Sequence, residues 1–166
     1  MSRIEIQKEF HFHAGHRLMR HKGLCASLHG HTYKVQVVVT GPRTLADYGD
    51  SGMVVDFSVL KDLYRAHVHE YLDHSTMLER GDPLIAAIHH AASTDLTLVK
   101  SQKLVVLPFA PTAEMLSACM YHNFHQHLPP ELDLVSVTVY ETPTSYARCT
   151  EVPEGMPREF HFRRSA

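Results

Sequence analysis

One stretch of the chain decides the fold: Leu28-His29-Gly30-His31-Thr32-Tyr33, which runs directly into Lys34-Val35-Gln36-Val37-Val38-Val39. Apolar side chains occupy the odd positions from 33 to 39, and polar ones occupy positions 32, 34 and 36. This period of two indicates a β-strand with one buried face. His29 and His31 share the odd, inward face, where their Cβ atoms are expected roughly 7 Å apart. The stretch therefore predicts a strand that carries two imidazoles on its protected side.

A second strand is predicted at residues 3–14, where apolar side chains occupy the even positions 4, 6, 10 and 12. Continuing this phase places His16 inward as well, unless a β-bulge near Gly15 breaks it. If the two strands are neighbours, His16, His29 and His31 converge on one protected face. Three neutral nitrogens without a fourth protein ligand nearby favour zinc with an open coordination position, which is the arrangement of a catalytic site.

The composition is that of one compact enzyme domain. The 166 residues are 44% hydrophobic and 20% charged, and a formal charge of −2 provides no basic field for nucleic acid. Three cysteines without a C-x-x-C spacing argue against a disulfide framework and for a reducing compartment. The N-terminus lacks the apolar run of a signal peptide, and no segment approaches transmembrane length. We therefore expect a cytoplasmic protein that does not bind membranes.

Two long helices are expected downstream of the strands. The first begins at Asp56, a plausible N-cap, and carries an apolar stripe to about Leu72. The second begins after Pro111-Thr112 and ends at Pro129-Pro130. The segment between them is predicted to contain a short helix at 83–92 and a short strand at 104–107. The last clear strand is expected at 134–141.

Glu141 continues the odd phase of Val135, Val137 and Val139 in that last strand. An inward carboxylate is costly unless a cation or a pair of hydrogen-bond donors meets it. Either the strand has ended and Glu141 turns into solvent, or it meets a ligand edge with two adjacent N–H donors, such as an aminopyrimidinone ring. The residues alone leave both readings open.

Six motifs follow one another along the chain: Phe12-His13-Ala14-Gly15-His16-Arg17-Leu18, Cys25 followed by His29-Gly30-His31, Val55-Asp56-Phe57, Leu72-Asp73-His74, Pro111-Thr112-Ala113-Glu114 and Glu141-Thr142. In this order they resemble the 6-pyruvoyl-tetrahydropterin synthase and 6-carboxytetrahydropterin synthase family. The resemblance implies an α+β tunnelling fold, with a four-stranded antiparallel sheet and two long helices on one face. It implies a single domain over residues 1–166. The long connection from about 75 to 110 departs from the family pattern, so we expect an insertion there. It also implies trimeric barrels, commonly stacked into a hexamer as a dimer of trimers, whose active sites are completed by neighbouring subunits.

Carried over residue by residue, the resemblance implies a role for nine side chains. His16, His29 and His31 would ligate Zn²⁺; Cys25, Asp73 and His74 would be catalytic; Glu141 would anchor the pterin, with Thr112 and Glu114 as secondary substrate-binding candidates.

Five of these nine side chains have a further structural alternative. Asp73 and His74 could simply be polar residues that end a helix, and Thr112 and Glu114 a helix cap and a first-turn acid. Cys25 could be inert, although the basic side chains of Arg20 and Lys22 nearby favour a reactive thiolate. These two residues and Arg17 could meet a triphosphate or simply be solvated.

The implied substrate is 7,8-dihydroneopterin triphosphate, a small-molecule pterin. Only three residues separate Cys25 from His29, and this short spacing resembles the carboxy-forming branch of the family. That branch gives 6-carboxy-5,6,7,8-tetrahydropterin, acetaldehyde and triphosphate, on the route to 7-deazapurines such as queuosine. The alternative is the pyruvoyl-forming branch, which eliminates triphosphate without cleaving a carbon–carbon bond. A non-catalytic metal- or pterin-binding module is less consistent with the joint presence of Cys25, Asp73, His74 and Glu141.

Overall fold

The computed structural model describes residues 3–41, 52–94, 102–156 and 162–163. Its elements follow the chain as β1 (Glu5–His16), η1 (Leu24–Ala26), β2 (His29–Thr40), α1 (Phe57–Tyr64), η3 (Arg65–His69), α2 (Glu70–Leu72), β3 (Ser75–Glu79), α3 (Pro83–Thr94), β4 (Leu104–Leu107), α5 (Ala113–His127), β5 (Asp133–Thr142) and β6 (Ser145–Cys149).

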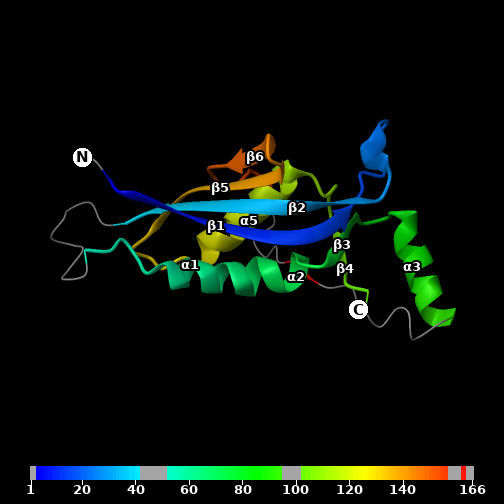
Figure 1. The fold of residues 1–166 in the computed structure, drawn as a ribbon, viewed down its shortest axis with the longest axis horizontal. Coiled ribbons are helices and arrows are strands. Elements are labelled where there is room, and N and C mark those ends of the chain that lie inside the picture. Colours follow the sequence, from blue (N-terminus) through cyan, green and yellow to red (C-terminus); the bar gives the residue numbers. More distant parts are fainter. Residues whose placement is uncertain (1–2, 42–51, 95–101, 157–161, 164–166) are drawn as a thin grey trace.

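The strands form one six-stranded sheet in the order β4-β3-β1-β2-β5-β6 (Figure 1). β1, β2, β5 and β6 pair antiparallel, whereas β3 pairs parallel with β1 and β4 pairs parallel with β3. The prediction of a four-stranded antiparallel sheet is therefore wrong. Four antiparallel strands are present, but two short parallel strands from the 75–110 segment extend them into a mixed sheet. The short helix and the strand at 104–107 predicted in this segment are confirmed, and residues 95–101 lie outside the described part.

The pairing of β1 with β2 runs without interruption from Glu5 opposite Thr40 to His16 opposite His29. No bulge interrupts it at Gly15, so the even phase of β1 persists to its last residue. Inward side chains on both strands, such as Phe12 and Tyr33, are fully buried, and their rings stack with centroids 4.7 Å apart. The predicted alternation of the two strands is confirmed.

Both predicted long helices are present and pack on the buried face of the sheet through residues such as Leu60, Val68 and Phe124 (Figure 1). The Asp56 side chain caps α1 by accepting a hydrogen bond from the Ser58 N–H at 2.7 Å. A π-helical turn, η3, joins α1 to α2. The third helix, α3, lies to the side, next to β3 and β4 (Figure 1). None of the helices in the described ranges has the length and apolar character needed to cross a membrane.

Candidate active site

Three imidazoles converge where β1 and β2 pair. His16 lies opposite His29, and His31 is two residues further along β2. The ring centroid of His16 is 4.5 Å from that of His29 and 5.0 Å from that of His31. One ligand atom from each of the three lies within 4.8 Å of the others. Tetrahedral zinc requires such nitrogens about 3.4 Å apart, so small side-chain rotations would let the three bind one ion.

Two of these rings are already oriented as ligands by backbone carbonyls. The Nδ1 atom of His16 is 2.7 Å from the Pro111 carbonyl oxygen, and the Nδ1 atom of His29 is 2.8 Å from that of Ser27. Because a carbonyl only accepts, Nδ1 carries the proton in each ring and Nε2 presents a lone pair. The Nε2 of His16 is buried and has no hydrogen-bond partner among the described residues. A buried nitrogen of this kind is costly unless something binds it, so the donor set fits a metal ion.

The electrostatics of the cluster favour neutral imidazoles. Burial lowers the pKa of His16 to about 4. The hydrogen bond that His16 donates to the Pro111 carbonyl oxygen opposes this shift, and His29 and His31 add smaller contributions that lower the pKa further. Burial also lowers the pKa of His31, and His29 lowers it further. Metal ligation requires deprotonated nitrogens, so the protein environment already provides the ligand form.

Glu141 approaches the three imidazoles from β5, with Oε1 4.0 Å from Nε2 of His16. It therefore faces the site, as the inward reading of its strand phase requires. Burial raises the pKa of Glu141, the neighbouring Glu114 raises it further, and His29 opposes both. A partly desolvated carboxylate here is suited to accept hydrogen bonds from a ligand.

Tyr33 belongs to the same face and was missed as a site residue by the sequence analysis. Its ring centroid is 5.8 Å from that of His16 and 5.5 Å from that of His31. The side chain is fully buried, and its hydroxyl has no hydrogen-bond partner in the part of the chain that the structure describes. An inward aromatic residue on a strand resembles ordinary core in sequence. Only the contact of its ring with two of the imidazoles, together with the buried hydroxyl that lacks a partner among the described residues, distinguishes Tyr33 from core.

The start of α5 closes this side of the site. The Thr112 hydroxyl caps the helix by accepting a hydrogen bond from the Met115 N–H at 3.3 Å, and Glu114 lies in the first turn. Thr112 thus acts as a helix cap and Glu114 is a first-turn acid, which are the structural roles considered for them above. Pro111, whose carbonyl oxygen accepts the hydrogen bond from His16, directly precedes Thr112. The position of the α5 N-terminus therefore determines the orientation of the His16 ring.

Cys25 lies in η1, the short turn between β1 and β2, and its side chain is half-buried. The Leu18 N–H donates a hydrogen bond to the Cys25 carbonyl oxygen at 2.8 Å. This bond ties the two ends of the connecting loop together. The thiol is thereby carried on the segment that leads into His29 and His31.

Asp73 and His74 form a close pair at the end of α2, with His74 Nδ1 2.7 Å from Asp73 Oδ2. The His13 N–H donates to Asp73 Oδ1 at 2.9 Å. Burial opposes ionisation of Asp73, but hydrogen bonds from His13 and His74 and the nearby charges of His69 and His74 outweigh it and lower the pKa of Asp73. The pair therefore holds an ionised carboxylate against an exposed imidazole, the usual arrangement for orienting a proton-transfer histidine.

This pair and the three imidazoles lie on opposite faces of the sheet. The His74 ring contacts the ring of His13, with centroids 5.8 Å apart. His13 belongs to the exposed odd phase of β1 and its Nδ1 lies 3.1 Å from the hydroxyl of Thr32 on the exposed phase of β2. His16 belongs to the buried even phase of the same strand. Within one chain, the sheet thus separates Asp73 and His74 from the candidate metal site.

Comparison with known proteins identifies the family to which the sequence is similar. A sequence model of 6-pyruvoyl tetrahydropterin synthase matches residues 5–152. The "Probable 6-carboxy-5,6,7,8-tetrahydropterin synthase" of Halobacterium salinarum is 41% identical over 130 residues, which cover 78% of this chain and 75% of that protein. The 6-carboxy-5,6,7,8-tetrahydropterin synthase of Haemophilus influenzae is 33% identical over 148 residues, covering 89% and 99%.

Solved structures show the same fold. An uncharacterized protein from Wolinella succinogenes superposes with a TM-score of 0.74 at 28% identity, covering 90% of this chain and 99% of that one. The 6-pyruvoyl tetrahydropterin synthase of Caenorhabditis elegans gives a TM-score of 0.62 at 22% identity, covering 91% and 97%. At that identity the second likeness supports the fold alone.

The imidazole cluster predicts how zinc content responds to substitution. Replacing both His29 and His31 with Ala should reduce bound zinc, measured by plasma mass spectrometry, to less than about a tenth of the wild-type content, because one imidazole cannot hold the ion. The circular dichroism spectrum should be unchanged, since both side chains are only partly buried. His89→Ala, an exposed histidine on α3, is the matched control and should keep full zinc. Wild-type zinc content in the double variant would contradict the assignment.

The lowered pKa of His16 predicts a pH dependence of the metal-free protein. Between about pH 6.5 and pH 4 the unfolded chain protonates this imidazole while the folded chain does not, so stability falls as the pH drops through this window. A shift to about 4 corresponds to a loss of about 3 kcal/mol. His16→Gln, whose amide can still donate to Pro111, should show a shallower decline in urea unfolding free energy between pH 7 and pH 4.5. Equal declines in both proteins would refute the linkage.

Proposed function

The chain belongs to the 6-pyruvoyl tetrahydropterin synthase family, and on that premise we propose that it converts 7,8-dihydroneopterin triphosphate to 6-carboxy-5,6,7,8-tetrahydropterin, acetaldehyde and triphosphate. It is an enzyme, like the curated relatives that bear the name 6-carboxy-5,6,7,8-tetrahydropterin synthase. The observation that carries the proposal is the convergence of His16, His29 and His31 on one protected face, with the inward Glu141 beside them. The product fits a role in the route to 7-deazapurines such as queuosine, in the cytoplasm.

Glu141 is the proposed anchor for the pterin ring. Its carboxylate offers two acceptor oxygens, and the adjacent ring N–H and exocyclic amino group of a pterin offer two donors in a matching fork. Burial disfavours the charged form of Glu141, and two charge-assisted hydrogen bonds from the ligand would offset that cost. The half-buried position thus favours binding of a ligand edge over contact with water alone.

The side chain of the bound pterin would lie toward the imidazoles. A zinc ion held by His16, His29 and His31 would acidify and orient the hydroxyls of this side chain. Cys25, on the loop that leads into two of the ligands, is the proposed base that removes a proton from the side-chain carbon. Only three residues separate Cys25 from His29. This short connection limits how far the thiol can lie from the proposed zinc site.

The Asp73–His74 pair is the proposed partner that returns a proton. Because this pair lies on the other sheet face from the imidazoles of its own chain, we infer that it serves the site of a neighbouring subunit. The side chain of His74 is 78% exposed, so it is accessible to such a neighbour. Asp73 fixes the tautomer of His74 by accepting from Nδ1, which leaves Nε2 for proton transfer.

The sheet has two borders through which subunits could join. Within the described ranges, β1 pairs on the side away from β2 only at residues 14–16, where β3 adds, and β6 pairs only with β5. Unpaired strand edges are normally covered. We infer that β6 of one subunit pairs with β1 of the next, closing trimers into barrels that stack as a hexamer.

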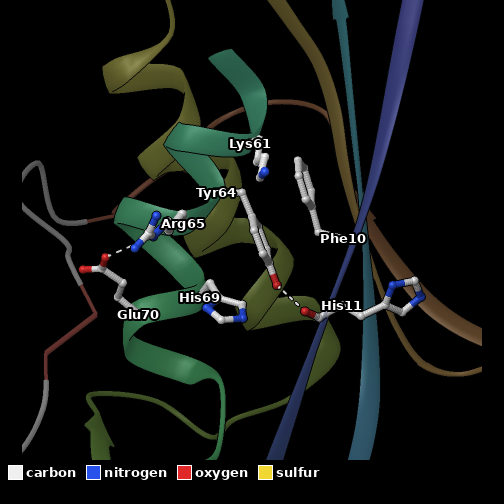
Figure 2. A pocket seen from close by; sticks show the side chains of 7 residues that line it. All are labelled: Phe10, His11, Lys61, Tyr64, Arg65, His69 and Glu70. Carbon is white, nitrogen blue, oxygen red and sulfur yellow. Dashed lines mark hydrogen bonds and ion pairs between the residues drawn. The ribbon is translucent and has the colours of Figure 1, made fainter. Parts of the chain in front are cut away.

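A pocket of about 500 Å³ opens between β1 and the continuous helical segment formed by α1, η3 and α2 (Figure 2). Figure 2 shows the Tyr64 ring stacked on Phe10, with the Tyr64 hydroxyl donating to the His11 carbonyl oxygen. The His11 imidazole points to the other side of the strand. The pocket contains none of the predicted site residues, and its apolar floor supports a role in subunit packing.

Product analysis tests the reaction. Purified enzyme incubated with 7,8-dihydroneopterin triphosphate should release one acetaldehyde, trapped as a hydrazone, for each 6-carboxy-5,6,7,8-tetrahydropterin detected by mass spectrometry. Cys25→Ala should keep its zinc but lose turnover, because the thiol acts on the substrate and does not ligate the ion. A pterin that retains all three side-chain carbons, without trapped acetaldehyde, would instead establish the pyruvoyl-forming reaction.

Subunit mixing tests the shared site. Cys25→Ala and His74→Ala should each be inactive, yet subunits dissociated together and reassembled should recover about a quarter of wild-type activity, the fraction of interfaces that combine both intact residues by chance. Cys25→Ala mixed with His29→Ala is the control, because these residues belong to the same site of one chain, and it should recover nothing. Absence of recovery in the first mixture would place His74 outside the site.

A further inference from the structure

Arg17, directly after the metal-ligand candidate His16, forms a buried ion pair with Asp82. Its guanidinium donates from Nε to Asp82 Oδ2 at 2.7 Å and from Nη2 to Asp82 Oδ1 at 2.6 Å. The Asp82 side chain is fully buried and that of Arg17 is 19% exposed. Taking a carboxylate out of water is costly unless strong hydrogen bonds replace the lost hydration. The two-bond geometry supplies them, so Arg17 is held in one position, with Nε and Nη2 both directed at Asp82.

Asp82 is itself held firmly, at the turn between β3 and α3. Its Oδ1 accepts a hydrogen bond from the Leu84 N–H at 2.9 Å, as an N-cap does, and its own N–H donates to the Glu79 carbonyl oxygen at 3.0 Å. Hydrogen bonds from Arg17 are the chief cause of the lowered pKa of Asp82. The carboxylate is therefore a fixed, ionised anchor supplied by the 75–110 segment.

The loop that carries Cys25 has few other anchors. The η1 turn contains no buried residue, and Leu24 is almost fully exposed. Most of its hydrogen bonds, such as that from the Leu18 N–H to the Cys25 carbonyl oxygen, join residues of the loop itself or the adjacent start of β2. Two side-chain contacts join it to the β3–α3 segment, namely the Arg17–Asp82 pair and the Arg20–Glu79 pair, in which Arg20 is exposed. Arg17 lies between His16 and Leu18, so an anchor at Arg17 fixes both the ligand strand and the thiol loop.

We propose that Asp82 is a positioning residue that, through Arg17 and Leu18, holds the Cys25 thiol in register with the three imidazoles. The catalytic meaning of this contact rests on the proposed function of Cys25. The 75–110 segment would then contribute to the site, because the turn between β3 and α3 places the buried Asp82 carboxylate against Arg17, at the start of the loop that carries Cys25. Misplacement of a reacting group by about 1 Å can reduce a rate by about 10²-fold, so loss of the anchor should affect turnover more than binding.

Asp82→Asn is the informative variant. Asparagine keeps an oxygen that can cap α3 through Leu84, but it loses the charge and the second acceptor that hold Arg17. We expect kcat to fall about 10- to 100-fold, with KM and zinc content within about twofold of wild type. The rate of alkylation of Cys25 by iodoacetamide, measured by peptide mass spectrometry, should rise several-fold as the loop loosens. Arg17→Lys, which retains one charged contact, should lie between wild type and Arg17→Gln in both measurements.

Glu79→Gln is the matched control. It removes the partner of Arg20, whose Nη2 lies 3.3 Å from Glu79 Oε1 and whose side chain is 78% exposed. An ion pair with one partner in solvent and a single 3.3 Å contact contributes little compared with the two-bond Arg17–Asp82 pair, so kcat and the alkylation rate should stay within twofold of wild type. The proposal is overturned if Asp82→Asn, or Arg17→Gln where the former fails to fold, keeps both kcat and the Cys25 alkylation rate within twofold of wild type. If wild type does not turn over the pterin, the proposed function fails, while the alkylation rates still decide whether Asp82 fixes the loop.

Discussion

The register of β1 against β2 is the constraint on which the site depends. Side chains alternate with a period of two, so a slip of one residue would send His29 and His31 to the exposed face of the sheet. The core prevents this slip, because Phe12 stacks on Tyr33 and the inward side chains Val35 and Val37 are fully buried. The geometry of the imidazole cluster is thus a consequence of apolar packing several residues away from it.

What the sequence predicts well is what local chemistry determines. Strand phase placed His16, His29 and His31 on one face, and cap residues at Asp56 and Thr112 marked where the two long helices begin. Each of these features depends on a few residues within one element, so a single sequence contains the information. The phase of Glu141 was less decisive because β5 is buried on both faces from Ser136 to Val139, and alternation there does not separate inside from outside.

What the sequence could not predict involves contacts between distant segments. β3 has only five residues and joins β1 in parallel at Ala14, Gly15 and His16, which no local period indicates. The Arg17–Asp82 pair joins residues 65 positions apart, and each partner alone resembles an ordinary surface charge. The position of His74 on the sheet face opposite the imidazoles likewise depends on how the chain crosses from α2 to β3. These long-range contacts determine where the site residues lie relative to one another. The local patterns determine only which strands and helices form and which face each side chain occupies.

The backbone of His74 connects this arrangement to function. Its φ of 56° lies in the left-handed region, where a residue with a Cβ costs roughly 1–2 kcal/mol and where glycine would be favoured. The conformation is held by the hydrogen bond from the His74 N–H to the His13 carbonyl oxygen at 2.7 Å. Because glycine would end α2 and lead into β3 with less strain, the turn by itself does not explain an imidazole at this position. The proposed proton-transfer role of His74 would explain it, because strained backbone persists where the side chain is needed, and the hydrogen bond to Asp73 holds this imidazole in the exposed position that such a role requires.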